Sequence, residues 1–443
     1  KKQRNITRYI RLFSLTGALF AYSAGVAMAV PQNVTLPTGG QFVSGRGNIT
    51  PSGSIMDIVQ NGQNAVIKWQ DFSIGGNATV NFSHKDGDNF NVLNYVNAGP
   101  VSEIYGTINA NNGNVFIVNP AGVTIGKSAQ INVGSLYVSN QNLGKEEFNK
   151  FNQNGNLDSL GNNNITAGEL MHLGYINAAE GKVTFVGDRI VLDADRIRDT
   201  QGKELYKSDV QGAQLTVKTN NAGQNLTVGY TAYDAENGGY VFKDTDTTVG
   251  AKDSKTTVIA KVDGSDYTKA NGYMWIDNVQ QLQAMNTNVS GRYALHNSID
   301  AVETSTWTGG FTSVIGKDAS NNDVAFSGSF DGLGYNIFDL NIKGDATTNV
   351  GLFANANKAT IKNINLVGGT ITGGNNVGAI VGSASNTTIS NITTSANVTG
   401  KTNVGGIVGS ATGISTLKDL VNIGGITGTA VSYTHLTLPT IRL

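Results

Sequence analysis

The sequence contains no cysteine, and it is poor in proline, histidine and charged residues. Its 443 residues include 6 Pro and 4 His, and Asp, Glu, Lys and Arg together make up 14%. Without cysteine the chain forms neither a disulfide scaffold nor a thiolate-ligated zinc site. The scarcity of proline excludes collagen, and the lack of heptads excludes a coiled coil. Disordered chains are rich in charge, whereas this one is 39% hydrophobic, so we expect it to fold.

Glycine and β-branched residues dominate what is there. The 56 glycines are about 13% of the chain, roughly twice the usual share. Short β-branched or aromatic runs recur about every 10 to 15 residues, separated by Gly, Asn and Asp. The clearest runs are residues 65–69, 78–82, 115–118 and 182–186. Only residues 145–151 and 279–285 suggest helices, and weakly. The sequence therefore predicts an all-β protein.

The first 29 residues have the pattern of a secretory signal peptide. Five basic residues lie within residues 1–11, a mostly apolar run covers 12–21, and Ala27-Met28-Ala29 is a cleavage pattern. The apolar run is shorter than the roughly 20 residues of a membrane span. Removal of these five basic residues, with no acidic ones, takes the formal net charge from −1 to −6. We therefore expect an exported protein with no nucleic-acid partner.

An internal repeat is the strongest physical signal in the chain. An Asn-Val-Gly pattern, once continued by Leu-Phe and twice by an Ile-Val-Gly run, recurs with offsets of 27 residues. Its Asn and Gly positions are Asn349, Gly351, Asn376, Gly378, Asn403 and Gly405. A period of this length fits one coil of a β-helix better than a propeller blade of 40–45 residues. We expect Val350, Val377 and Val404 to form one interior column, Phe353, Val381 and Val408 another, and the asparagines to form hydrogen-bonded ladders.

Several motifs in the first half resemble a known family. They are Trp69-x-x-Phe72, then Leu93-Asn94-Tyr95-Val96, and then Asn119-Pro120-Ala121-Gly122-Val123. Together they resemble the secretion domain of filamentous-haemagglutinin-like exoproteins of two-partner secretion systems, over roughly residues 30–200. The resemblance implies a right-handed parallel β-helix with an N-terminal cap. It also implies export through an outer-membrane β-barrel transporter with periplasmic binding domains.

Two positions depart from the family's pattern. The family has Asn where this chain has Ala121, and Arg where it has Tyr95. These departures leave the expected fold unchanged and bear on recognition by the transporter. From the residues alone, Asn119 to Gly122 has the signature of a type I turn at a corner of the solenoid.

The rest of the chain divides by composition and by a second resemblance. Residues 349–410 resemble GLUG-type repeats of large surface proteins, and residues 279–300 resemble the segment that often precedes them. The last residues lack Gly and Asn and resemble translated adapter sequence, so we treat the chain as a fragment of a longer protein. The expected order is a signal peptide (1–29), a secretion domain (30–250), a linker and repeat preamble (251–310), GLUG-type repeats (311–430) and a non-native tail (431–443).

The patterns that suggest binding or catalysis are weak. Residues 121–128 fit a relaxed phosphate-loop pattern, but 129–134 alternate like a strand rather than opening a helix. Residues 86–89 lack the fifth-place ligand of a calcium loop and are expected to form a surface turn. Asp193 and Asp195 are expected on one strand face, in a solvated ion-pair ladder with neighbouring arginines. The four histidines are scattered: His84, His172, His296 and His435.

The sequence therefore favours an adhesin-type exoprotein that acts as a binding shaft. We expect no catalytic residues, no metal site and no cofactor, and a ligand on a host or neighbouring cell. One alternative is a polysaccharide-active enzyme on the same helix, which would need clustered carboxylates on one face. Another is the stalk of a contact-delivered toxin, which would need a distinct domain beyond residue 443.

Overall fold

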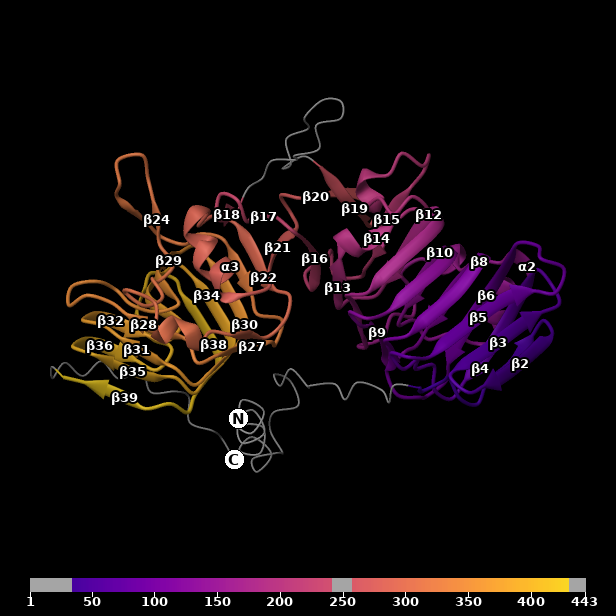
Figure 1. Cartoon of the computed structure of the whole chain (residues 1–443), viewed down its shortest axis with the longest axis horizontal. Helices are drawn as coiled ribbons and strands as arrows, with labels where there is room; N and C mark the ends of the chain where they lie inside the picture. Colours follow the sequence, from indigo (N-terminus) through magenta and orange to yellow (C-terminus); the bar gives the residue numbers. More distant parts are fainter. Residues whose placement is uncertain (1–33, 241–256, 430–443) are drawn as a thin grey trace. The chain divides into compact units, whose positions relative to one another are not determined.

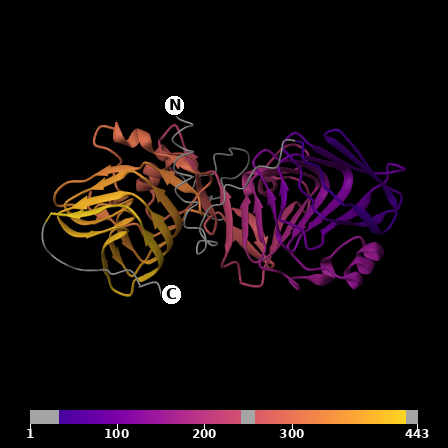
Figure 2. The same ribbon diagram turned by 90° about the horizontal axis from the view of Figure 1, so that it is seen from below.

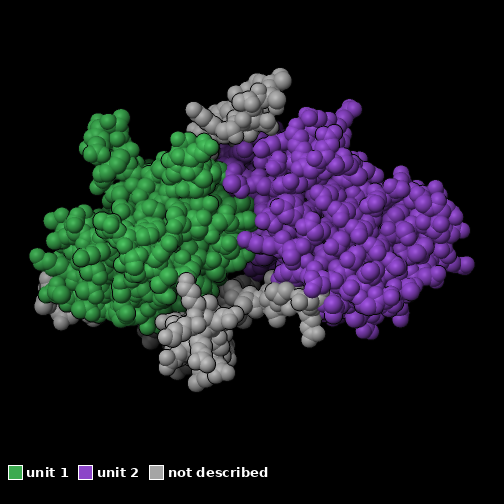
Figure 3. Space-filling view, viewed as in Figure 1, with its two compact units in different colours: residues 1–28, 232–241, 274–443 green, residues 29–231, 242–273 purple. Residues whose placement is uncertain are grey.

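A computed structural model describes residues 34–240 and 257–429, which form mostly parallel β-strands (Figure 1). The expected signal peptide and the expected tail lie outside these residues. Contacts divide the chain into two compact units, shown in different colours in Figure 3. Unit 2 holds residues 29–231 and 242–273, and unit 1 holds 232–241 and 274–443, with 1–28. Within the described residues no helix is long and apolar enough to cross a membrane.

Unit 2 is a stack of coils, each of which adds one strand to each of two parallel rows. The first row is β4 (Asn64–Trp69), β6 (Phe90–Val96), β8 (Thr107–Val118), β10 (Gln130–Ser139), β12 (Tyr175–Val186) and β15 (Gln214–Lys218). The second row is β7 (Ser102–Ile104), β9 (Gly122–Ile125), β11 (Glu169–His172), β13 (Ile190–Asp193) and β16 (Leu226–Tyr230). This arrangement confirms the predicted right-handed parallel β-helix.

The N-terminal end of this stack is closed by antiparallel strands. Strand β1 (Gln41–Ser44) pairs antiparallel with β4, and β2 (Gly47–Ser52) pairs antiparallel with β3 (Ile55–Gln60). Strand β3 then runs parallel to β5 (Thr79–His84). Because β1 occupies the edge of β4, that edge is not left free to pair with another chain. The expected N-terminal cap is therefore present.

The interior of unit 2 consists of aligned apolar columns. In-register pairing places Ala65, Val92, Val115, Leu136 and Val183 one above another, and each of them is at most 2% exposed. A side chain at every second position of a strand points to the same face. The alternate positions therefore point out of the coil.

A helix covers the outward-facing apolar positions. Leu93 and Phe116 lie on the outer face, where α2 (Lys145–Asn154) packs Phe148 and Phe151 over them. The Phe116 and Phe151 ring centroids are 4.9 Å apart. Figure 2 shows α2 in magenta beside the coils of unit 2. This second covered face explains why the strands are almost continuously hydrophobic, and the weakly predicted helix is confirmed.

Asparagine ladders run along unit 2 as well as along the repeats, for which they were predicted. In one ladder Asn91 Nδ2 donates to Asn64 Oδ1 at 2.7 Å, and Asn114 Nδ2 donates to Asn91 Oδ1 at 3.0 Å. A second ladder begins at the Asp57 carboxylate, which accepts from Asn81, and continues through the amides of Asn109, Asn132 and Asn177, with distances of 2.7–2.9 Å. Each amide has one donor and one acceptor edge, so stacking satisfies both.

Unit 1 contains the 27-residue repeats. Its helix α3 (Val279–Ala284) is the second predicted helix. Strand β22 (Arg292–Leu295) pairs parallel with β26 (Ser329–Asp331), which leads into the repeats. The repeats form parallel rows: β30 (Thr360–Val367), β34 (Thr388–Thr394) and β38 (Thr416–Asn422); β29 (Phe353–Asn357), β33 (Val381–Ser385) and β37 (Val408–Thr412); β32 (Asn375–Gly378) and β36 (Thr402–Gly405); β28 (Asn341–Lys343), β31 (Thr370–Thr372), β35 (Asn397–Gly400) and β39 (Ile426–Gly428).

The predicted columns of the repeats are confirmed. Val377 pairs with Val350 of the preceding coil and with Val404 of the following one. In the same way Val381 lies between Phe353 and Val408. Val350 and Val377 are at most 1% exposed, whereas Val404, in the last described coil, is half-buried, so the column is interior where coils cover it on both sides.

Each residue of the Asn-Val-Gly pattern has a separate structural reason. Asn376 and Asn403 adopt left-handed backbone angles, φ 45° and 51°, which Asn tolerates better than most residues. Their side chains continue a ladder from Asn349, with distances of 2.8 and 2.7 Å. A Cβ on Gly351 would lie 2.7 Å from the carbonyl oxygen of Gly378 in the next coil. Only glycine allows the coils to approach so closely.

We predict that Val377→Asp destabilises the protein by at least about 3 kcal/mol, because it buries a carboxylate without a partner. The urea unfolding midpoint measures the effect. Thr372→Asp is the matched control, since Thr372 is exposed on β31. Equal midpoints for the Val377→Asp and Thr372→Asp proteins would contradict the interior column.

Candidate functional site

The corner between β8 and β9 is a hydrogen-bonded turn. Gly122 N donates to Asn119 O at 2.9 Å, which closes a four-residue turn. Ala121 N donates to the side-chain oxygen of Asn119, also at 2.9 Å. Such a side-chain turn is typical of Asn before a tight corner. The turn expected from the sequence is therefore present.

Asn119 also joins this corner to the preceding coil. Its Nδ2 donates to the carbonyl oxygen of Pro100 at 2.7 Å and to Ser102 Oγ at 3.0 Å. The side chain is buried, with the residue 1% exposed. Alanine at this position would remove all three hydrogen bonds, including the one to Ser102, which is fully buried, and lost buried hydrogen bonds are costly.

The following coil holds the other side of the corner. Thr166 Oγ1 donates to the carbonyl oxygen of Pro120 at 2.5 Å. Gly122 has φ 120°, and a Cβ there would lie 2.6 Å from Glu169 O. Within the turn, Ala121 is exposed whereas Asn119 and Gly122 are buried. The departure from the family's pattern therefore occurs at the solvent-facing position.

The structure brings Trp69, Phe72 and Asn94 together inside unit 2. Trp69 Nε1 donates to Asn94 Oδ1 at 3.0 Å, and the Trp69 and Phe72 ring centroids are 5.4 Å apart. Asn94 is fully buried in the column between Ile67 and Ile117. The indole supplies the hydrogen-bond partner that a buried amide needs, so this pair is a satisfied polar contact inside the coil. The repeat residues of the sequence analysis lie in unit 1, so the structure does not place them in this site.

Tyr95 acts on the opposite face. Its hydroxyl donates to Asn142 Oδ1 at 2.9 Å, and its ring meets Phe148 of α2 edge-on, with centroids 5.2 Å apart. The tyrosine at the family's arginine position therefore anchors the segment that carries α2.

The expected strand face with Asp193 and Asp195 is wrong. Strand β13 ends at Asp193, and the next residues form a 3₁₀ turn, η2 (Ala194–Arg196). Asp193 Oδ1 accepts a hydrogen bond from Asp195 N at 3.2 Å, and this local bond competes with strand continuation. The Asp193 side chain is 3% exposed and pairs with Arg196 at 3.1 Å, so the pair is not a solvated ladder.

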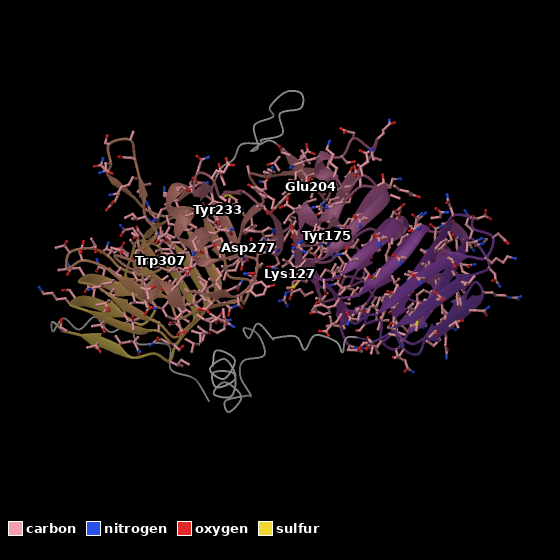
Figure 4. The ribbon with its side chains drawn as sticks, viewed as in Figure 1. Lys127, Tyr175, Glu204, Tyr233, Asp277 and Trp307 are labelled. Carbon is pink, nitrogen blue, oxygen red and sulfur yellow. The ribbon has the colours of Figure 1, made fainter. Side chains whose placement is uncertain are left out.

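The surroundings of Asp195 are also structural. Its carboxylate accepts hydrogen bonds from Tyr206 Oη at 2.9 Å and from Thr231 N at 2.6 Å. Burial raises the pKa of the Asp195 carboxyl. The guanidinium groups of Arg196 and Arg198 lie over the ring of Tyr175, which Figure 4 labels. These contacts secure the end of a coil.

The segment that follows the phosphate-loop pattern is a strand. Residues 130–139 form β10, as their alternation predicts. A phosphate loop positions the amide groups of a helix N-terminus around the phosphates. The described segment after Lys127 is extended and does not supply them.

Comparison with known families decides what kind of protein this is. Residues 27–290, more than half of the chain, match the family described as TPS secretion domain. The chain belongs to the TPS secretion domain family. It is thus an exoprotein of a two-partner secretion system, secreted across the outer membrane to the cell surface or medium via the periplasm. Residues 245–396 match a second family, described as M26 IgA1-specific metallo-endopeptidase N-terminal region.

Individual relatives cover parts of this TPS exoprotein. Heme/hemopexin-binding protein of Haemophilus influenzae is 29% identical over 215 residues, which are 46% of this chain and 21% of that protein. Halomucin of Haloquadratum walsbyi is 38% identical over 125 residues, 27% of this chain and 1% of that protein. The chain thus spans about a fifth of the first relative and about a hundredth of the second. The crystal structure of the HMW1 secretion domain from Haemophilus influenzae aligns with 14% identity and a TM-score of 0.31, over 88% of this chain and 99% of that one.

A buried histidine lies on β11 of this TPS domain, three residues beyond the residue that pairs with Gly122. His172 is on β11, between Ile125 of β9 and Leu192 of β13, and it is fully buried. Burial lowers the pKa of His172 from 6.5 to about 4, although the nearby Asp193 carboxylate acts in the opposite direction. The sequence did not reveal that His172 is buried, because its burial depends on coils that are distant along the chain.

We predict that the TPS domain loses stability as the pH falls from about 6.5 to about 4. In this window the unfolded chain binds a proton at His172 and the folded chain does not, so the free energy of unfolding decreases by up to about 3 kcal/mol. His172→Leu should remove this part of the pH dependence in urea titrations at each pH. Phe185→Leu is the control, because it alters the same layer without a titrating group. A His172→Leu protein with the wild-type pH profile would contradict the prediction.

Proposed function

We propose that the chain is part of an adhesin-type exoprotein that acts as a non-catalytic binding shaft. In this proposal it is exported through an outer-membrane β-barrel transporter with periplasmic binding domains. The observation that carries the proposal is a TPS secretion domain joined to a second unit of stacked, in-register repeats. Stacked repeats extend a structure in one direction and present the same faces many times.

The proposed division of the chain follows the same logic. Residues 30–250 are the secretion domain, 251–310 the linker and repeat preamble, and 311–430 the repeats. The two family matches overlap at residues 245–290, close to the proposed linker. This overlap supports a change of module in that region.

A binding role has support from a relative. One relative is by name a heme/hemopexin-binding protein, but the aligned part is about a fifth of its length, so we do not transfer its ligand. We propose instead a ligand on a host or neighbouring cell. The repeated asparagines bond one another, so their amides serve the shaft itself rather than catalysis.

An enzymatic alternative has less support. The second family match bears the name of a metallo-endopeptidase N-terminal region, yet the sequence contains no His-Glu-x-x-His motif for a zinc protease. A polysaccharide-active site would need free carboxylates, and those of Asp193 and Asp195 bond the chain's own groups. The toxin-stalk alternative would be decided by reading the gene downstream of residue 443.

We propose that the Asn119–Gly122 corner is needed for export. It bonds the coil before it through Asn119 and the coil after it through Pro120. If the first coils fold outside the cell and template later ones, a defect at this corner stops the stack early. Ala121 is the exposed residue of this turn, and we expect the transporter to contact the turn there.

The double change Asn119→Ala with Gly122→Val should sharply reduce the protein in the culture medium when the cognate transporter is co-expressed. The matched control is Asn403→Ala with Gly405→Val in the last described coil. A Cβ on Gly405 would lie 2.0 Å from Val408 O, and one on Gly122 2.6 Å from Glu169 O, so both changes strain the backbone. Immunoblots of culture supernatants compare the two proteins, and equal secretion would show that the corner has no special role in export.

The binding role has its own test. Purified secreted chain, fluorescently labelled, is incubated with cultured epithelial cells and with cells of neighbouring bacteria. Saturable binding that unlabelled chain displaces supports an adhesin. The absence of saturable binding to either cell type would contradict it, whatever the outcome of the secretion assay.

A further inference from the structure

The turn between β5 and β6 gathers three metal-binding side chains. His84 is the last residue of β5, and residues 85–89 form the surface turn that the sequence predicts. Gly87 N donates to His84 O at 3.0 Å, and Gly87 has φ 78°. This turn folds Asp86 and Asp88 back toward the histidine. From the sequence the two aspartates were expected only in a surface turn, without His84.

Ligand atoms of His84, Asp86 and Asp88 all lie within 4.8 Å of one another. Across residues 34–240 and 257–429, this is the single group of three or more such residues with that spacing. Even at the full 4.8 Å, the centre of the triangle is about 2.8 Å from each atom. Bonds from zinc to His N or Asp O are about 2.0–2.2 Å. Movements of the ligand atoms by less than about 1 Å would therefore bring them to bonding distance.

The three side chains differ in exposure and in hydrogen bonding. Its side chain is 7% exposed, whereas those of Asp86 and Asp88 are 60% and 75% exposed. His84 Nδ1 accepts a 3.3 Å hydrogen bond from Asp86 N, and Nε2 has no hydrogen-bond partner among the described residues. His84 Nδ1 also lies 3.8 Å from Asp88 Oδ2. The aspartates, being exposed, are free to turn toward the histidine.

A pocket lies beside this group. Its volume is about 210 Å³, and its lining includes His84, Asp88, Asn81, Asn109, Asn111 and Asn112. The pocket exists because β8 bulges: Ala110 pairs with Val133 and Asn114 with Ser135, so residues 111–113 carry extra length. Asn112 Nδ2 donates to Gly87 O at 3.3 Å, which ties the bulge to the turn. The pocket has room for waters and offers amide oxygens.

We propose that His84, Asp86 and Asp88 bind one divalent transition-metal ion, with water completing the coordination from the pocket. Imidazole nitrogen with carboxylate oxygen is a donor set for zinc and similar ions, whereas calcium takes six to eight oxygens. The ion would neutralise two neighbouring carboxylates, of which only Asp86 has a lysine partner, Lys85 at 3.7 Å. It would join the end of β5 to the turn that follows.

Binding of this kind stabilises only the folded chain, because the three ligands come together there. The test uses the full secreted chain without an affinity tag, freed of metal by a chelator. Isothermal titration with Zn²⁺ should give one site per chain, and zinc should raise the melting temperature. Calcium, titrated separately, should bind at least tenfold more weakly.

His84→Gln and Asp88→Asn should each weaken zinc binding at least tenfold and remove the zinc-dependent rise in melting temperature. Asp209→Asn is the matched control, because Asp209 is an exposed aspartate paired with Lys203 outside the site, and it should bind zinc as wild type does. Equal melting temperatures of all variants without metal show that they fold. Failure of the wild-type chain to bind zinc, wild-type affinity in both site variants, or calcium binding as tight as zinc binding would each overturn the proposal.

Discussion

The in-register stacking of one coil on the next is the constraint on which the rest of this structure depends. A parallel strand can satisfy its backbone only if the neighbouring coils place a strand of the same register beside it, and a slip of one residue would turn the interior face outward. The same register produces the apolar columns, such as Val350, Val377 and Val404, and the asparagine ladders. It also explains Gly351, whose missing side chain lets the next coil approach.

This constraint determines how much of the fold was predictable. The 27-residue repeat revealed the register of unit 1 directly, because equivalent residues of identical coils must stack. The short apolar runs revealed the strands of unit 2. The role of α2 was not predictable, because Phe148 and Phe151 meet Leu93 and Phe116 only through tertiary packing. The end of β13 was missed because the Asp193 side chain bonds the backbone of the next turn. The alternation of polar and apolar residues does not show that this local bond replaces a continued strand.

The candidate site was predictable in its residues and not in its contacts. The residue types at Asn119 to Gly122 and their order are enough to predict a turn. Its partners, however, are Pro100 in one coil and Thr166 in another, and their distance along the chain depends on the length of each coil and on the excursion that carries α2. The same holds for Asn94, whose partner Trp69 lies 25 residues away. A sequence motif therefore identifies the residues of a turn, whereas the lengths of the coils determine which residues of other coils contact it.

A strictly repeated register also decides where new chemistry can arise. Inside the rows many polar side chains bond the neighbouring coil, as in the ladders and in the Asn94–Trp69 pair, so a change there breaks a contact within the stack. Connections and bulges are different, because they can lengthen without shifting the rows. The turn at residues 85–89, the bulge at 111–113 and the segment around α2 are such places. His84 and Asp88 lie at the first, and Asn112 lies at the second. The metal-binding side chains proposed for this chain therefore lie where the chain departs from its repeat, because a connection or a bulge can change its residues without breaking the stacking of the rows.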